Sequence, residues 1–233
     1  MKERVKRSFS RSAENYDEVA QLQLLAGERL LRRLELFENP FPLLDLGAGT
    51  GKLTPEGGVC LDIAPKMAER CRERGRAAVC ADAERIPFKE SSFKTVISNF
   101  ALQWTELHRS LKETHRVLKE GGYFLLSIPV EGSLETLFKC WREVGSSLPL
   151  FKFPEEREVF EKFKELFEVV EFERFTVKKE FKSAKAAVKA VNGVGAKNPF
   201  GRPKRGELLR FLEIYSKEPM VEYRVLLISG RKV

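Results

Sequence analysis

The feature that most constrains the fold is an apolar run that passes directly into three alternating glycines, Leu43-Leu44-Asp45-Leu46-Gly47-Ala48-Gly49-Thr50-Gly51. The leucines predict a buried strand, and the glycines after it permit a strained turn that a ligand can approach closely. A dinucleotide-binding turn has the spacing G-x-G-x-x-G, whose third glycine would fall at Lys52. Here the spacing is G-x-G-x-G, with Asp45 two positions before the first glycine. The pattern predicts a nucleotide-type cofactor but argues against a dinucleotide.

The apolar segments alternate between strand-like and helix-like patterns. Runs of apolar residues predict strands at 42–46, 59–62, 78–81, 95–98, 123–128, 168–177 and 221–229. Helical spacing predicts helices at 19–37, 65–74 and 107–118, the last of them ended by Gly121-Gly122. Such alternation is typical of an α/β fold with a mostly parallel sheet covered on both faces.

The first connection between strands is short. Only residues 52–58 separate Gly51 from the second predicted strand, and they include Pro55, Gly57 and Gly58. A parallel crossover usually needs about a dozen residues or more, including its helix. We therefore expect the first crossover helix to be reduced to about one turn.

Polar residues end or follow four of the predicted strands: Asp45, Asp62, Asp82 and Asn99. In such sheets ligands bind beyond the carboxyl ends of the strands. An acid after the second strand can accept hydrogen bonds from both ribose hydroxyls of a nucleoside, and one after the third can receive an adenine amino group. Each residue alone is equally well explained as a helix N-cap or a turn residue. Together they predict an adenosine site without a pyrophosphate cradle, which fits S-adenosylmethionine (SAM) better than NAD.

Composition excludes several classes of protein. The 233 residues are 42% hydrophobic and 33% charged, and no apolar run reaches the length of about 18 residues that a membrane span needs. The four cysteines, Cys60, Cys71, Cys80 and Cys140, form no C-x-x-C pair and have no neighbouring histidines. We therefore expect reduced thiols in a cytoplasmic, single-domain protein without a metal site.

Basic residues are concentrated in one segment. The formal net charge is +8, and residues 178–205 hold nine Lys and Arg residues against one acid, Glu180. Lys182, Lys185 and Lys189 recur at helical spacing and would share one helix face. Such a run is explained either by a solvated helix face or by a docking surface for an acidic macromolecule, because clustered charge raises encounter rates.

Motifs along nearly the whole chain resemble one family of enzymes. The loop G-x-G-x-G, preceded by an acid, resembles the first motif of class I SAM-dependent methyltransferases. Within that superfamily the chain resembles the malonyl-[acyl-carrier protein] O-methyltransferases of biotin synthesis. The residues that carry the resemblance are Phe9, Tyr16, 20–23, 61–67, 81–88, 98–104, 131–134, 141–144 and 191–196, followed by Arg202 and Arg205.

This resemblance implies a Rossmann-like sheet of seven strands, mostly parallel with an antiparallel last strand, with N-terminal helices and a helical lid. It implies SAM as the methyl donor and S-adenosyl-L-homocysteine as the product. The residues it assigns to the cofactor are Asp45, Gly47, Ala48, Gly49, Asp62, Ile63, Met67, Asp82, Ala83 and Asn99. Within one domain, 1–233, we expect an N-terminal helical cap (1–40), a cofactor-binding core (41–130), a helix and late strand (131–182), a substrate lid (183–216) and a closing strand (217–233).

The resemblance also implies methyl transfer to the free carboxylate of a malonyl thioester. A carboxylate is already deprotonated near neutral pH, so the reaction needs no general base. Arginine is the natural clamp for a carboxylate, and we expect Arg205 in this role, with Arg202 as the second candidate. Both arginines are also explained as part of the basic surface. Tyr16 would close over the cofactor, and Gln103 and Trp104 would form one wall of the acceptor pocket.

The malonyl group would arrive on a phosphopantetheine arm attached to an acidic acyl-carrier protein, for which the basic 178–205 segment is the expected docking region. We expect a monomer that binds neither membrane nor nucleic acid. A nucleic-acid methyltransferase is disfavoured because Ser98-Asn99-Phe100-Ala101 differs from the N-P-P-Y type of motif. Two alternatives stay open: a methyltransferase for another small carboxylate or a quinone-type acceptor, and a SAM-binding protein without catalytic activity.

Overall fold

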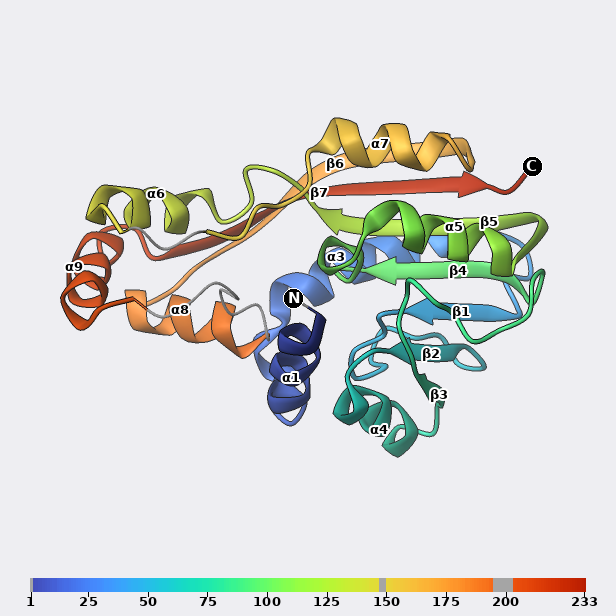
Figure 1. Ribbon diagram of the computed structural model, residues 1–233, viewed down its shortest axis with the longest axis horizontal. Coiled ribbons are helices and arrows are strands. Elements are labelled where there is room, and N and C mark those ends of the chain that lie inside the picture. The colour runs from blue at the N-terminus through green and yellow to red at the C-terminus, as the bar shows by residue number, and fades with distance from the viewer. Residues whose placement is uncertain (1, 147–149, 195–202) are drawn as a thin grey trace.

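The computed structural model describes residues 2–146, 150–194 and 203–233. Its described part contains one seven-stranded sheet in the order β3-β2-β1-β4-β5-β7-β6 (Figure 1). The strands are β1 (Leu43–Leu46), β2 (Val59–Asp62), β3 (Ala77–Cys80), β4 (Phe93–Asn99), β5 (Leu118–Pro129), β6 (Glu168–Glu180) and β7 (Met220–Arg231). Pairing is parallel from β3 to β5, and β7 is antiparallel to both of its neighbours. The predicted α/β sheet, mostly parallel with an antiparallel last strand, is confirmed.

Helices cover both faces of this sheet. The helices are α1 (Lys2–Ser12), α2 (Tyr16–Val19), α3 (Gln21–Leu34), α4 (Pro65–Glu73), α5 (Leu107–Val117), α6 (Glu135–Val144), α7 (Glu156–Lys164), α8 (Ala184–Gly193) and α9 (Arg205–Tyr215). Successive strand residues point to opposite faces. In β5, Leu125 packs in a buried cluster with Leu30 of α3, whereas Phe124 belongs to the cluster that includes Leu111 of α5 and Phe163 of α7. The sheet therefore lies between α3 on one side and α5 and α7 on the other.

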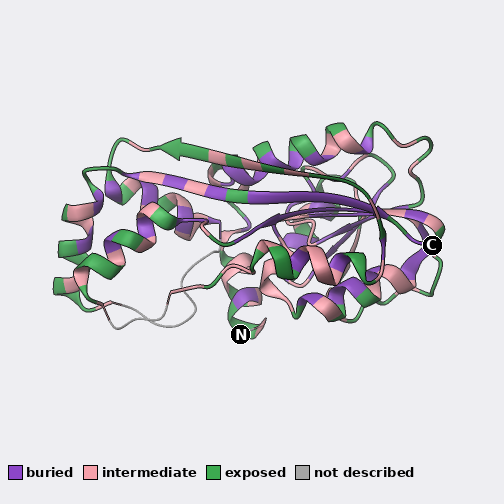
Figure 2. Ribbon diagram, turned by 90° about the horizontal axis from the view of Figure 1, so that it is seen from above, coloured by how far each residue is buried: buried purple, intermediate pink, exposed green. Residues whose placement is uncertain are grey.

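β6 and β7 continue beyond the parallel strands as a two-stranded ribbon. β5 pairs with β7 from Val225 to Arg231, whereas β6 accompanies β7 as far as Met220. The projecting part of the ribbon carries α6, α8 and α9, which form a second helical group at one end of the molecule (Figure 1). Its core includes the fully buried Phe211 and Tyr215 of α9. Figure 2 shows β7 buried over most of its length and β6 as the exposed edge of the sheet.

Two sequence predictions about connections had different outcomes. Among the described residues no helix lies between β1 and β2, so the shortened first crossover is confirmed. The prediction that Gly121-Gly122 ends a helix is wrong, because α5 ends at Val117 and both glycines lie inside β5. A Cβ on Gly122 would lie 2.8 Å from the backbone oxygens of Lys119 and Lys94, so close strand approach requires glycine here. None of the helices in the described ranges is long and apolar enough to cross a membrane.

Candidate active site

The glycine loop follows β1 at the carboxyl edge of the sheet. Gly47 and Ala48 donate backbone hydrogen bonds to the Leu61 carbonyl of β2, at 2.7 and 3.1 Å. Gly47 has a φ of +77° and Gly49 a φ of +56°, a region that favours glycine. A Cβ on Gly47 would lie only 2.2 Å from the Cβ of Ala101. The backbone of the loop therefore packs where no side chain fits.

Two buried carboxylates hold this loop in place. Asp62 accepts hydrogen bonds from the backbone N–H of Gly49 at 2.9 Å and of Ala64 at 2.8 Å. Asp45 accepts one from the Thr54 hydroxyl at 2.6 Å. Burial raises the pKa of Asp62 to about 6 and that of Asp45 to about 7, while the hydrogen bonds act in the opposite direction. Because a carboxylate oxygen can accept more than one hydrogen bond, Asp62 retains capacity for ribose hydroxyls.

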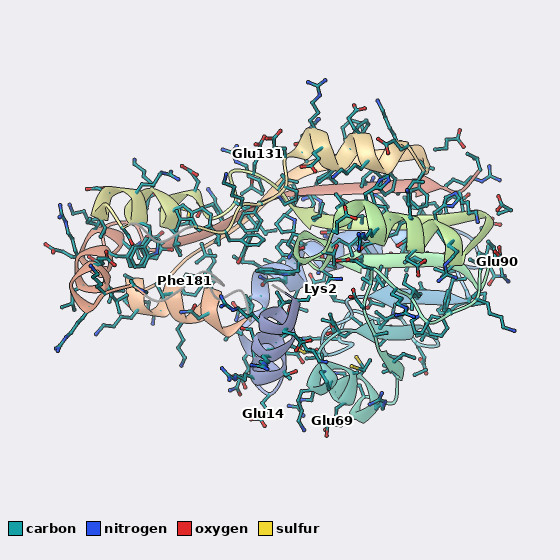
Figure 3. The ribbon with its side chains drawn as sticks, viewed as in Figure 1. Lys2, Glu14, Glu69, Glu90, Glu131 and Phe181 are labelled. Atoms are coloured by element: carbon teal, nitrogen blue, oxygen red, sulfur yellow. The ribbon has the colours of Figure 1, made fainter. Side chains whose placement is uncertain are left out.

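Asp82 contacts the N-terminal helix. The Lys2 ammonium of α1 lies 2.7 Å from Asp82 Oδ2 and 2.6 Å from Glu84 Oε2. The other Asp82 oxygen accepts a hydrogen bond from the Glu84 backbone N–H at 2.9 Å. Figure 3 shows Lys2 at the centre of the molecule, where α1 meets the sheet. The carboxylate predicted to receive the adenine amino group thus faces an amine donor in this structure.

Asp17 connects the short helix α2, to which it belongs, with the glycine loop. It accepts a hydrogen bond from the Thr50 hydroxyl at 2.6 Å and forms an ion pair with Arg74, which follows α4. Its neighbour Tyr16 lies beside the loop, since a Cβ on Gly49 would be 3.6 Å from the Tyr16 ring. Burial, reinforced by the nearby charge of Asp62, raises the pKa of the Tyr16 hydroxyl above its usual range. This hydroxyl is therefore a neutral donor at neutral pH.

Two small hollows of about 80 and 40 Å³ open at this edge of the sheet, and both are lined by Tyr16, Gly47, Gly49 and Asn99. The side-chain nitrogen of Asn99 donates to the Gln23 carbonyl at 3.0 Å, but its side-chain oxygen is buried without a partner in the described part of the chain. An orphaned acceptor beside a bare glycine backbone and strand-end carboxylates fits the amino, ribose and adenine groups of SAM. The residues present therefore suit this cofactor.

Nine of the ten residues predicted to bind the cofactor line these hollows. They are Asp62, Ile63, Asp82 and Ala83 around the larger one, Asp45 and Ala48 around the smaller one, and Gly47, Gly49 and Asn99 around both. Met67 is the exception. It is fully buried in a cluster with Ala13 and Ala64, against which Phe9 and Tyr16 pack. Met67 therefore supports the side chains that line the site but does not line it.

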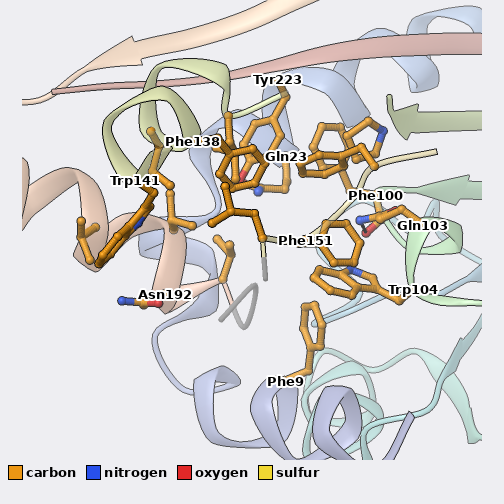
Figure 4. A pocket seen from close by; sticks show the side chains of 18 of the residues that line it. Phe9, Gln23, Phe100, Gln103, Trp104, Phe138, Trp141, Phe151, Asn192 and Tyr223 are labelled. Atoms are coloured by element: carbon orange, nitrogen blue, oxygen red, sulfur yellow. Dashed lines mark hydrogen bonds between the residues drawn. The ribbon is translucent and has the colours of Figure 1, made fainter. Parts of the chain in front are cut away.

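A larger cavity of about 460 Å³ lies between this edge and the helical group on the β6–β7 ribbon (Figure 4). Its wall is mainly apolar and rich in aromatic side chains, which are Phe9, Tyr16, Phe100, Trp104, Phe138, Trp141, Phe151, Phe153, Phe211 and Tyr223. Trp141 stacks on Phe211 with ring centroids 4.1 Å apart, and Trp104 lies 4.5 Å from Phe151. Tyr16 lines this cavity and both cofactor hollows. The two hollows and this apolar cavity therefore meet at Tyr16, and we call the larger space the acceptor cavity after the acceptor pocket that the sequence predicts.

Few polar side chains reach the acceptor cavity. Gln103 lines it, donates from Nε2 to the Phe100 carbonyl at 2.7 Å, and has a buried side-chain oxygen without a partner among the described residues. Gln23 and Tyr223 also line it, and burial raises the pKa of the Tyr223 hydroxyl while the neighbouring Gln23 side chain acts in the opposite direction. These groups, with Tyr16 and Asn192, offer neutral hydrogen-bonding partners and no charge.

The two arginines predicted to clamp the carboxylate are not in the described wall of this cavity. Arg205 is exposed at the first position of α9, although Pro203 and Leu208 from the same segment do line the cavity. Arg202 lies outside the described residues. No lysine or arginine of the described ranges lines the cavity, and no cluster of His, Cys, Asp and Glu in them is arranged to hold a metal.

Sequence reasoning missed several residues of the acceptor cavity. Gln23 and Trp141 belong to motifs that carried the resemblance, but no role was assigned to either. Tyr223 lies on the same buried face of β7 as Val221 and Val225, so the sequence alone suggests an ordinary core residue. Only folding shows that these residues, from α3, α6 and β7, line the same cavity.

The family described as Methyltransferase domain matches residues 44–126. A malonyl-[acyl-carrier protein] O-methyltransferase from Halorhodospira halophila is 36% identical over 219 residues, covering 86% of this chain and 74% of that protein. The protein of the same name from Methylococcus capsulatus is 33% identical over 233 residues, covering 91% of this chain and 85% of that protein. The chain belongs to the malonyl-[acyl-carrier protein] O-methyltransferase family. Its predicted assignment as a SAM-dependent O-methyltransferase is thereby confirmed.

Solved structures support the family's fold. A SAM-dependent methyltransferase from Thermotoga maritima, titled a possible histamine N-methyltransferase, superposes with a TM-score of 0.63 at 21% identity, covering 98% of this chain and all of that one. A methyltransferase from Bacillus halodurans gives a TM-score of 0.59 at 18% identity over 82% of this chain and 91% of its own. At these identities the similarity establishes the class I methyltransferase fold of the family and not its acceptor.

Proposed function

We propose that this protein transfers the methyl group of SAM to the free carboxylate of a malonyl thioester on acyl-carrier protein. The product is the malonyl methyl ester that primes pimeloyl synthesis for biotin in the cytoplasm. The observation that carries the proposal is the acceptor cavity, which meets the cofactor hollows at Tyr16 in a chain of this family.

When bound, SAM supplies a methyl group already activated by its sulfonium charge. Asp62, Asp82, Asn99 and the glycine loop would hold it at the sheet edge. The acceptor carboxylate is ionised near neutral pH and needs no base. The protein must therefore orient the carboxylate and remove its water, and such positioning is worth about 7–11 kcal/mol in favourable cases.

The apolar cavity makes desolvation effective but also costly, because an ionised carboxylate strongly prefers water to an apolar surrounding. Neutral partners from Tyr16, Gln23 and Gln103 offset part of that cost. Arg205 and Arg202 remain our candidates for a counter-charge. Arg205 would serve from the rim, since it stands two residues after Pro203 and three before Leu208, which both line the cavity.

The carrier protein would dock on the basic 178–205 segment. The bases of this segment that the structure describes are all exposed: Lys178, Lys179, Lys182, Lys185, Lys189, Lys204 and Arg205. They lie at the end of β6, along α8 and at the start of α9, which belong to the helical group around the acceptor cavity. In this arrangement residues 183–216 act as a lid, and the enzyme works as a monomer.

The deciding experiment measures methyl transfer from labelled SAM to malonyl-carrier protein. Free malonate, medium-chain monocarboxylic acids and quinols serve as competing acceptors. We expect base-labile methyl ester on the carrier protein and at least about 100-fold lower kcat/KM for the free acids, because they lose the binding energy of the carrier and its arm. The uncharged wall of the cavity also favours an apolar carboxylate or quinone-type acceptor. Efficient methylation of such a compound, with none of the malonyl-carrier protein, would replace our proposal by that alternative.

A further inference from the structure

A separate groove of about 280 Å³ lies on the outer side of the acceptor cavity, between the α2–α3 segment and α8. It shares four residues with that cavity: Gln23, Val191, Val194 and Tyr223. The two spaces are therefore separated by a wall that is one layer of side chains thick. Gln23 lines the groove, the cavity and the smaller cofactor hollow alike.

The polar part of this wall is formed by the side chains of Gln23 and Tyr223. Gln23 is 7% exposed and Tyr223 3% exposed, so both lie inside the protein between two open spaces. Figure 4 shows the two side chains together at the back of the acceptor cavity. Gln23 has the more flexible side chain of the two, and its rotamer can change without moving a helix or strand.

The outer part of the groove is basic. Lys179 at the end of β6 and Lys189 on α8 both line it and are exposed. Lys179 donates to the Gln21 side chain at 2.5 Å and lies 5.2 Å from the Phe181 ring, which Figure 3 labels beside α8. Neither lysine has a carboxylate partner among the described residues, although Glu18 also lines the groove.

The middle of the groove is lined by apolar side chains, two of which are alanines. Ala186 and Ala190 stand one turn apart on α8 and both line it, facing Val19 and Leu22 from the α2–α3 segment. Small side chains at these positions leave room for a slender ligand. From outside to inside, the groove thus presents ammonium groups, small apolar side chains, and then an amide and a phenol.

We infer that this groove takes the phosphopantetheine arm of the carrier protein, an assignment that rests on the proposed function. An acyl group tethered to a carrier must reach a buried site through a passage as slender as its arm. The arm has a phosphate at its outer end, a dimethyl segment and amides in its middle, and a thioester at its inner end. Its chemistry follows the order found in the groove, with Lys179 and Lys189 at the phosphate and Gln23 and Tyr223 at the entry to the acceptor cavity.

The test compares thioesters of malonate that differ only in their arm: malonyl-phosphopantetheine, malonyl-pantetheine without the phosphate, and malonyl-carrier protein. The double variant Lys179→Glu/Lys189→Glu should raise KM for malonyl-phosphopantetheine about tenfold or more, because two charge-assisted contacts become repulsive. KM for malonyl-pantetheine should stay within about twofold of the wild-type value. Lys112→Glu, an exposed lysine on α5, is the matched control and should change neither value.

A second variant tests the passage itself. Ala190→Trp should fill the groove and lower kcat/KM at least about tenfold for both arm-bearing small thioesters and for malonyl-carrier protein, because the arm loses its space. Its melting temperature and SAM dissociation constant, measured in parallel, show whether the variant is folded with an intact cofactor site. Direct titration with phosphopantetheine alone should give binding that the double charge reversal removes.

The outcomes are distinct. If wild-type protein methylates malonyl-phosphopantetheine but the charge reversal and a folded Ala190→Trp variant do so equally well, the arm uses another route and the inference is wrong, while the proposed function stands. If a folded, SAM-binding wild-type protein methylates no malonyl thioester, the proposed function fails and the inference fails with it. Loss confined to the phosphate-bearing thioesters in the charge-reversed protein, together with loss of all three in Ala190→Trp, supports the groove as the arm's path.

Discussion

The cofactor side and the acceptor side of this active site are built in contrasting ways. On the cofactor side, the backbone of a glycine loop and carboxylates at strand ends line the hollows, and these groups lie between Asp45 and Asn99. On the acceptor side, aromatic side chains from Phe9 to Tyr223 surround a cavity that contains few polar groups. A local backbone conformation can be specified by a short motif, whereas a cavity wall depends on how distant elements pack. The cofactor side is therefore suited to one ligand, whereas substitutions in the cavity wall can change which ligand the acceptor side takes.

The largest expected effect comes from Gly47→Ala. The new Cβ would meet that of Ala101 at 2.2 Å on a backbone with φ +77°, so the loop must move. We expect the SAM dissociation constant to rise at least about 100-fold, measured by calorimetry, because the loop can no longer hold its ligand-binding conformation.

Gly75→Ala is the matched control for Gly47→Ala. Gly75 has a φ of +73°, but no atom lies within 4 Å of the added carbon. It should lose about 1–2 kcal/mol of stability and bind SAM normally. Equal SAM affinity in both variants would contradict a backbone-built cofactor side.

Trp141→Ala tests the acceptor side in the same way. It removes the ring that stacks on Phe211 at 4.1 Å and opens the cavity wall. Loss of about 2 kcal/mol of packing should lower kcat/KM for malonyl-carrier protein about 30-fold. The SAM dissociation constant should remain within about twofold of the wild-type value, because no cofactor hollow includes Trp141. A parallel loss of SAM affinity would show that the two sides are not independent.

Arg205→Ala tests whether this arginine at the rim of the uncharged cavity binds the substrate carboxylate. We expect kcat/KM for malonyl-carrier protein to fall about tenfold, as for loss of one charge-assisted contact, with SAM binding unchanged. Arg210→Ala, on the same exposed helix, is the control for general surface charge. If the two variants behave alike, Arg205 contributes to the basic surface and does not clamp the substrate.

The last prediction concerns the folding stability that depends on Asp45 and leaves the acceptor side untouched. Burial raises its pKa from the usual 3.8 to about 7, so the folded protein holds a proton that the unfolded chain releases between about pH 4 and pH 7. Folding stability due to this group is therefore present at pH 4 and lost as pH rises, by at most about 4 kcal/mol. Asp45→Asn keeps an oxygen for Thr54 and should raise the melting temperature by several degrees at pH 8.5 but not at pH 4.

Two comparisons control this experiment. Glu56→Gln, at an exposed position, should leave the melting temperature unchanged at both pH values. SAM affinity of Asp45→Asn should fall even while its stability rises, because the buried charge serves the ligand at the expense of the fold. A melting temperature that is lower at pH 8.5 than that of the wild-type protein would show that the ionised carboxylate stabilises the fold.

Much of the cofactor side could be predicted because its determinants are local. The spacing around Gly47 and Gly49, and the polar residues that end successive strands, translate directly into the sheet edge seen here. The length of residues 52–58 likewise excluded a full crossover helix. Gly121-Gly122 shows where local reasoning fails: glycine serves equally to end a helix and to let strands approach closely, and only the pairing of β4 with β5 decides between them.

The acceptor side was less predictable for a related reason. Alternation in β6 and β7 indicates two strands, but it does not show that their ends project beyond β5 and carry three helices. Trp141 stacks on Phe211, 70 positions away, and Gln23 lines the same cavity as Tyr223, 200 positions away. No periodicity in the sequence reports such contacts. Arg205 illustrates the converse: a residue type suited to a carboxylate was recognised, yet its side chain is exposed on α9.

The side-chain contacts of Asp17 bear on how the product of the cofactor leaves the site. One carboxylate joins the wall of the cofactor hollows to Thr50 on one side and to Arg74 on the other. Turnover requires S-adenosylhomocysteine to leave, and the contacts of Asp17, like those of Lys2 with Asp82 and Glu84, join side chains of the N-terminal segment to the sheet edge without being part of the sheet. Because these ion pairs are partly exposed, salt weakens them, and we expect the rate of product release to rise with ionic strength.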